Sequence, residues 1–178
     1  MGYAVELNLC RGNAARVVKV WESLAREGLN PVMLDLGAQP HVSLAVFEEL
    51  NPEALRADLR RFAEVTPPLS VDLAFAGTFP TAEGVVFLAP VVTQELLALH
   101  SRFHSVLRER GIDSVEYYRP GNWVPHCTVA IDLAPDQVAA ALEICVQSQA
   151  FGPVILDELS LIEFRPVREI YTFSLRGR

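Results

Sequence analysis

The sequence carries one short pattern twice, as Pro40-His41-Val42-Ser43 and as Pro125-His126-Cys127-Thr128. Each pattern is a proline, a histidine, a variable residue and a hydroxyl residue, and each opens a run typical of a β-strand. Because side chains on a strand alternate between its two faces, the histidine and the hydroxyl of each pattern share one face. Val42 and Cys127 then point to the opposite, buried face. A fold that contains both strands must therefore present an imidazole beside an alcohol at two places.

The order of the predicted elements also repeats. In each half of the chain a helix and a loop precede the histidine strand, and a second helix and a hairpin follow it. The first half is expected to hold strand 3–9, helix 13–27, strand 41–47, a helix from Pro52, and strands 70–79 and 84–88. The second half is expected to hold helix 94–110, strand 126–131, a helix from Pro135, and strands 154–164 and 169–175. Residues at equivalent positions of the two halves are separated by nearly the same number of residues along the chain. Gly28 and Gly111 are one such pair.

This repetition predicts a duplicated α+β unit packed about a pseudo-twofold axis. The two sequence repeats span approximately residues 1–90 and 91–178. No linker rich in Gly, Ser or Pro separates them, so we expect one bilobal domain over residues 1–178, with intertwined lobes. Such packing would place the two histidine strands opposite each other across a central groove.

Composition limits the partners that we expect. Of the 178 residues, 51% are hydrophobic and 21% are charged, as in ordinary soluble globular proteins. The formal net charge of −7 argues against a surface for long nucleic acids, but it permits a local site for one phosphate or a short RNA end. With no signal peptide and no apolar run of about 20 residues, we expect a cytoplasmic monomer without membrane association. The three dispersed cysteines are read as reduced thiols.

A histidine pair and a cysteine are two further candidates for a site. His100 and His104 are four residues apart on a predicted helix, but no third ligand is evident, so we expect residues at the margin of the apolar face and no metal. Cys127 is expected to be a small core residue rather than a nucleophile.

The loop before the second histidine strand contains candidate substrate contacts. Tyr118 and Trp123 could stack on a base, and Arg119 could pair with a phosphate. The alternative, held equally, is a folded loop whose aromatics fill the groove wall. Phe79, at the end of strand 70–79, is a further candidate contact. Arg165 and Arg168 are expected to be solvated turn charges.

On these residues the chain resembles the 2H phosphoesterase superfamily, in its 2′-5′ RNA ligase-like (LigT-like) and cyclic phosphodiesterase branch. The resemblance covers essentially the whole chain, and residues 123–130 resemble the second motif of the family. It implies a bilobal α+β fold in which two antiparallel β-sheets line a central groove, with helices packed outside. His41, Ser43, His126 and Thr128 match the four motif positions. Relatives associated with ligase activity often carry an arginine near the first strand, where this chain has Glu6.

The resemblance implies hydrolysis of 2′,3′-cyclic phosphates or 2′-5′ linkages without a metal or cofactor. One neutral histidine would take a proton from water, and the other, protonated, would give one to the leaving ribose oxygen. Ser43 and Thr128 would donate hydrogen bonds to the phosphoryl oxygens. Either histidine could take either role.

Three alternatives remain at this point. The chain could be a 2′-5′ RNA ligase or a 2′-5′ phosphodiesterase on oligonucleotides, or a non-catalytic protein that binds nucleotides or RNA ends. Metal-dependent hydrolysis is the least favoured, because neither motif supplies a carboxylate or a third histidine ligand.

Overall fold

The computed structural model describes residues 2–164 and 166–177. Its elements are β1 (Gly2–Leu9), α1 (Arg11–Arg26), α2 (Val32–Asp35), β2 (His41–Phe47), α3 (Pro52–Val65), β3 (Leu69–Thr78), β4 (Val86–Pro90), α4 (Gln94–Glu109), the 3₁₀ turn η1 (Glu116–Tyr118), β5 (Cys127–Ala130), α5 (Pro135–Gln147), β6 (Gly152–Phe164) and β7 (Arg168–Ser174). Every predicted helix and strand is present, and the short helix α2 and the turn η1 occupy segments predicted as loops.

The seven strands form one antiparallel sheet in the order β2-β1-β6-β3-β4-β5, and β7 pairs with β6. The α+β class is therefore confirmed. In place of two separate sheets, hydrogen bonding continues from one lobe to the other. The reason is the length of β6, whose first residues pair with β3 and whose later residues pair with β1.

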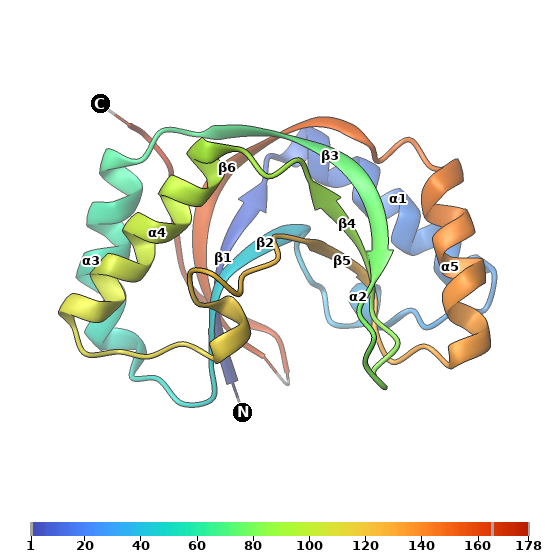
Figure 1. Cartoon of the computed structure of the whole chain (residues 1–178), viewed down its shortest axis with the longest axis horizontal. Coiled ribbons are helices and arrows are strands. Elements are labelled where there is room, and N and C mark those ends of the chain that lie inside the picture. Colours follow the sequence, from blue (N-terminus) through green and yellow to red (C-terminus); the bar gives the residue numbers. More distant parts are fainter. Residues whose placement is uncertain (1, 165, 178) are drawn as a thin grey trace.

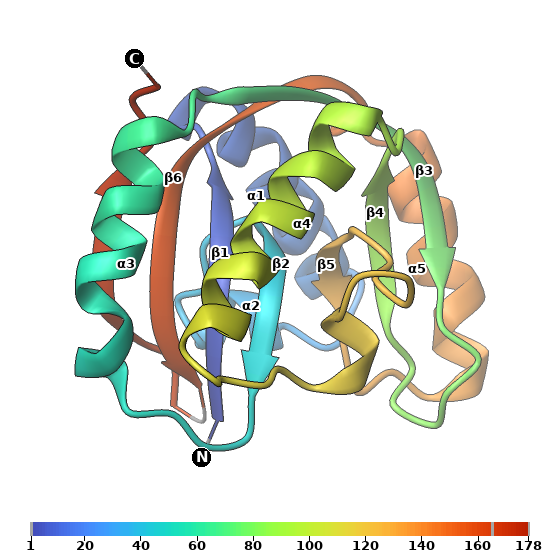
Figure 2. The same cartoon turned by 60° about the vertical axis from the view of Figure 1, so that its left-hand side comes forward.

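The helices cover the two lobes in pairs (Figures 1 and 2). Helix α3 packs on β6 and β7, and its Phe62 contacts Phe103 of α4 edge-on. On the other side, α1 and α5 pack together against β3, β4 and β5. Each sequence half thus contributes a helix and strands to both lobes. None of the described helices combines the length and apolar composition that a membrane span requires.

Strand alternation separates the core from the polar face. On β2, Val42 and Leu44 are buried in the apolar core, as is Cys127 on β5. Because neighbouring strand residues point to opposite faces, the histidine and hydroxyl side chains between them face away from this core. The fold therefore brings the two polar pairs to the inner face of the sheet.

Candidate active site

The two histidine strands open onto one cleft of about 410 Å³. His41 and Ser43 line it from β2, and His126 and Thr128 line it from the β5 side. The structure thus brings together the four residues that the repeated pattern singles out. A larger groove of about 580 Å³, between α1 and α5, contains none of them.

The two imidazoles are held in the same way. Nδ1 of His41 lies 2.6 Å from the carbonyl oxygen of Gln39, and Nδ1 of His126 lies 2.7 Å from that of Val124. A carbonyl oxygen only accepts hydrogen bonds, so each Nδ1 carries a proton and donates it. Nε2 is thereby the nitrogen of each ring that can exchange a proton in the cleft, and that of His41 also contacts the side chain of Glu6.

Both strands contain a β-bulge directly after the hydroxyl residue. Glu6 of β1 pairs with Ser43 and the preceding residue pairs with Ala45, so Leu44 is left out of the ladder. In the same way, β4 pairs with Thr128 and Ala130 of β5 and leaves out the residue between them. A bulge bends a strand and redirects its side chains, and such bulges are common beside active sites.

The two tryptophans of the chain anchor these strands. The indole Nε1 of Trp123 donates a hydrogen bond to the carbonyl oxygen of Ser43 (2.9 Å), and that of Trp21 donates to the carbonyl oxygen of Thr128 (3.3 Å). Of the two alternatives for Trp123, its position favours the folded loop, because it does not line the cleft and its ring packs against the core. Its observed contacts support the backbone under the site.

His100 and His104 are buried, which corrects the prediction that they lie at the margin of the apolar face of the helix. The ring of His100 stacks on Trp123, with 3.8 Å between centroids, and its Nε2 bonds the carbonyl oxygen of Tyr118 at 2.9 Å. Nε2 of His104 bonds the carbonyl oxygen of the bulged Leu44 at 3.0 Å. The helix periodicity could not reveal this burial, because it depends on distant contacts: Trp123 stacks on His100, and the backbone of β2 meets His104.

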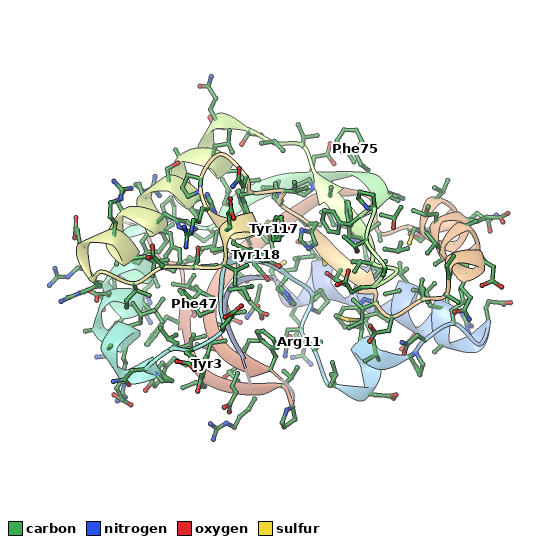
Figure 3. The ribbon with its side chains drawn as sticks, turned by 60° about the horizontal axis from the view of Figure 1, so that its bottom comes forward. Tyr3, Arg11, Phe47, Phe75, Tyr117 and Tyr118 are labelled. Carbon is green, nitrogen blue, oxygen red and sulfur yellow. The ribbon has the colours of Figure 1, made fainter. Side chains whose placement is uncertain are left out.

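The other three predicted contacts lie in three different places. Tyr118 lines the cleft, and Figure 3 shows it next to the exposed Tyr117. Phe79 packs edge-on against His126, with 5.0 Å between ring centroids. Arg119 lies on a different pocket, where its Nε donates to the carbonyl oxygen of Ser114 (2.8 Å). Of the turn arginines, Arg168 pairs with a neighbouring glutamate, and Arg165 lies outside the described residues.

Two polar residues of β1 also line the cleft, although they were not predicted as site residues. Glu6 is 4% exposed, and its Oε1 lies 3.2 Å from Nε2 of His41. Asn8 is buried and donates a hydrogen bond from Nδ2 to the hydroxyl of Ser160 (2.6 Å). The alternation of β1 carries the signal, because Glu6 and Asn8 interrupt an otherwise apolar strand on one face.

The surroundings set the protonation of the other groups. Burial lowers the pKa of His126, the nearby His41 lowers it further, and the bond to Val124 acts in the opposite direction. Burial raises the pKa of the Cys127 thiol to about 12, so this core residue is not a thiolate nucleophile at neutral pH. Within residues 2–164 and 166–177, no three histidine, cysteine or acidic side chains come together as a set of metal ligands.

Comparison with known proteins identifies a family and a relative that match most of the chain. The family model described as the 2′-5′ RNA ligase superfamily matches residues 15–167. A Bacillus licheniformis protein, provisionally named a phosphoesterase, is 25% identical over 126 residues, which cover 69% of this chain and 70% of the relative.

Two solved structures share the fold. TT0787 of Thermus thermophilus matches with a TM-score of 0.64 and 20% identity over 100% of both chains. Escherichia coli LigT in complex with 3′-AMP matches with a TM-score of 0.64 and 18% identity over 97% of both chains.

Proposed function

The chain belongs to the 2′-5′ RNA ligase superfamily, and from this premise we propose that it is a metal-independent phosphodiesterase that hydrolyses 2′,3′-cyclic phosphates of nucleotides or RNA ends. The observation that carries the proposal is the paired site itself. Two imidazoles, each fixed through Nδ1 and each accompanied by a hydroxyl on the same strand, line a single cleft.

This arrangement supports acid–base catalysis at phosphorus. One Nε2 takes a proton from the attacking water, and the other gives a proton to the ribose oxygen that leaves. The hydroxyls of Ser43 and Thr128 donate hydrogen bonds to the non-bridging phosphoryl oxygens, where negative charge builds up in the transition state. Because the reaction uses protons and neutral donors only, we propose that it needs no metal or cofactor.

The size of the cleft supports a small substrate. A volume of about 410 Å³ falls in the range of small-molecule sites. We therefore propose that the substrate is a nucleotide or a short RNA end, bound by a monomer. The 3′-AMP bound to Escherichia coli LigT is a ligand of this size and chemistry.

The first test is a substrate panel assayed with and without EDTA. It contains 2′,3′-cyclic mononucleotides, ADP-ribose cyclic phosphate and 2′-5′ dinucleotides. We expect turnover of the cyclic phosphates that the chelator does not reduce. Higher activity on the 2′-5′ dinucleotides would instead favour a 2′-5′ phosphodiesterase or RNA ligase. Binding without turnover would favour a nucleotide-binding protein, and loss of activity with EDTA would indicate a metal enzyme.

Substitution of either histidine tests the assignment of the site. We expect His41→Ala and His126→Ala each to reduce kcat by about 10²–10⁴-fold, the usual contribution of one proton-transfer group. The matched control is Glu64→Gln, on the exposed face of α3, which should retain activity. Thermal unfolding of all three variants reports whether they are folded. Full activity in a folded histidine variant would contradict the proposed function.

A further inference from the structure

The two halves of the site differ at one equivalent position. In the ladder between β1 and β2, Glu6 lies opposite Ser43, whereas in the ladder between β4 and β5, Phe87 lies opposite Thr128. Both pairs stand beside the same kind of bulge, so Glu6 and Phe87 are structural equivalents. One histidine is therefore next to a carboxylate, and the other is next to a phenyl ring.

Both ring nitrogens of His41 face acceptors. Nδ1 is 2.6 Å from the carbonyl oxygen of Gln39, and Nε2 is 3.2 Å from Oε1 of Glu6. The side chain of Glu6 is only 5% exposed, and that of His41 is 17% exposed. A short contact of this kind, largely out of water, requires a proton between Nε2 and Oε1.

Among residues 2–164 and 166–177, the ring of His126 has one such acceptor. Its Nδ1 donates to Val124, while Phe79 and Phe87 pack against its ring at 5.0 and 5.3 Å between centroids. Aromatic walls of this kind disfavour a charged imidazole, and burial correspondingly lowers the pKa of His126. A neutral ring with its proton on Nδ1 has a free lone pair on Nε2.

We propose that Glu6 is a positioning residue that holds a proton on His41, so that His41 is the proton donor and His126 the proton acceptor when a phosphodiester lies between them. The inference rests on the proposed function and extends it, because it breaks the near symmetry of the two motifs.

The resulting step is balanced in atoms and charge. Nε2 of His126 takes a proton from water as the water oxygen forms its bond to phosphorus. The bond from phosphorus to one ribose oxygen breaks, and the proton on Nε2 of His41 moves to that oxygen. His126 is then protonated by the proton from water, His41 has given its proton to the ribose oxygen, and exchange with solvent restores both rings. The net reaction adds one water to the cyclic diester.

The other titratable groups around the pair leave its proton in place. Burial raises the pKa of the Tyr118 phenol and of the Cys127 thiol, and Glu6 raises both further, so both groups are neutral near pH 7. Glu169 lines the same cleft from β7. The pKa of Glu6 itself is raised, because burial outweighs the opposing effect of the nearby His41.

The first experiment uses the wild-type protein and needs no substrate. Imidazole nitrogen chemical shifts, assigned with His41→Asn and His126→Asn, report the protonation of each ring as a function of pH. At any pH where the protonated fractions of the two imidazoles differ, we expect that of His41 to be the larger. A more protonated His126 would overturn the proposal.

The second experiment compares Glu6→Gln with the surface control Glu64→Gln. The amide keeps the shape of Glu6 and removes the carboxylate oxygen that lies 3.2 Å from Nε2 of His41. We expect the alkaline limb of the pH–rate profile to move toward lower pH, because an opposite charge that favours the protonated imidazole has been removed. The profile of Glu64→Gln should match that of the wild type.

The outcomes separate this inference from the function on which it rests. An unchanged pH profile in an active Glu6→Gln variant would overturn the role of Glu6 and leave the phosphodiesterase intact. If no diester were turned over and His41 were still the more protonated ring, the proposed function would be overturned. The interaction of Glu6 with the proton on His41 would still be supported.

Discussion

The hydroxyls of Ser43 and Thr128 lie one residue before a bulge, and each belongs to a residue whose carbonyl oxygen is held by an indole. These contacts fix the backbone on which each hydroxyl is mounted. A donor fixed before the reaction stabilises developing charge without the cost of reorienting it. The hydroxyl itself, rather than the bulk of the side chain, should therefore matter for catalysis.

Substitution at Thr128 separates these two contributions. Thr128→Val keeps the shape and removes the donor, and we expect kcat to fall by about 10²–10³-fold, as for loss of one oxyanion-stabilising donor. Thr128→Ser keeps the donor and should retain most of the activity. Steady-state kinetics on a 2′,3′-cyclic nucleotide, with thermal unfolding as the check on folding, measure both. Equal activity in the two variants would contradict a hydrogen-bonding role.

Residues within a local pattern could be predicted, and residues that depend on distant pairing could not. His41, Ser43, His126 and Thr128 are defined by four adjacent positions and by strand alternation, so their grouping follows from the sequence. The contact of Glu6 with His41 depends on how β1 aligns with β2 after a bulge. No local pattern encodes that alignment.

At the scale of elements, α4 supports the site through its buried imidazoles. His100 bonds the backbone of η1, and His104 bonds the backbone of β2. The helix therefore ties together the loop and the strand that form one side of the cleft. The limits of strand 41–47 are confirmed, because its signals are local. The burial of the two imidazoles of α4 depends on contacts with a loop and with β2, and it became visible only in the fold.

This burial makes folding sensitive to pH. Burial, with a smaller effect of the neighbouring His104, lowers the pKa of His100 from 6.5 to about 4. Between these two values the unfolded chain binds a proton that the folded protein does not. The contribution of His100 to stability is therefore complete above about pH 6.5, and it is lost as the pH falls toward 4.

Urea unfolding at several pH values checks this dependence. We expect the free energy of unfolding of the wild type to fall between pH 7 and pH 4.5. His100→Phe, which keeps a ring against Trp123, should show a smaller fall. Ser101→Ala, on the exposed side of the same helix, should retain the wild-type slope. If the free energy of unfolding of His100→Phe depended on pH as steeply as that of the wild type, His100 would not be the group responsible for the pH dependence.

At the scale of the whole molecule, neither sequence repeat forms a lobe by itself. The first repeat supplies β1 and β2 to one lobe and β3 and β4 to the other. The second repeat supplies β6, which lies between β1 and β3 and pairs with both. The buried apolar residues of the two lobes also form one continuous cluster. Stability of one lobe therefore depends on strands that also belong to the other.

This interleaving predicts one cooperative unfolding transition for residues 1–178. Calorimetry should give equal calorimetric and van't Hoff enthalpies, the sign of a two-state process. The fragments 1–90 and 91–178 should each lack stable structure by circular dichroism, because each exposes strand edges and apolar faces that the other covers. Two separate transitions, or a folded 1–90 fragment, would contradict a single domain. The two histidines would then belong to units that unfold independently, and a shared cleft could not be maintained when either unit unfolds.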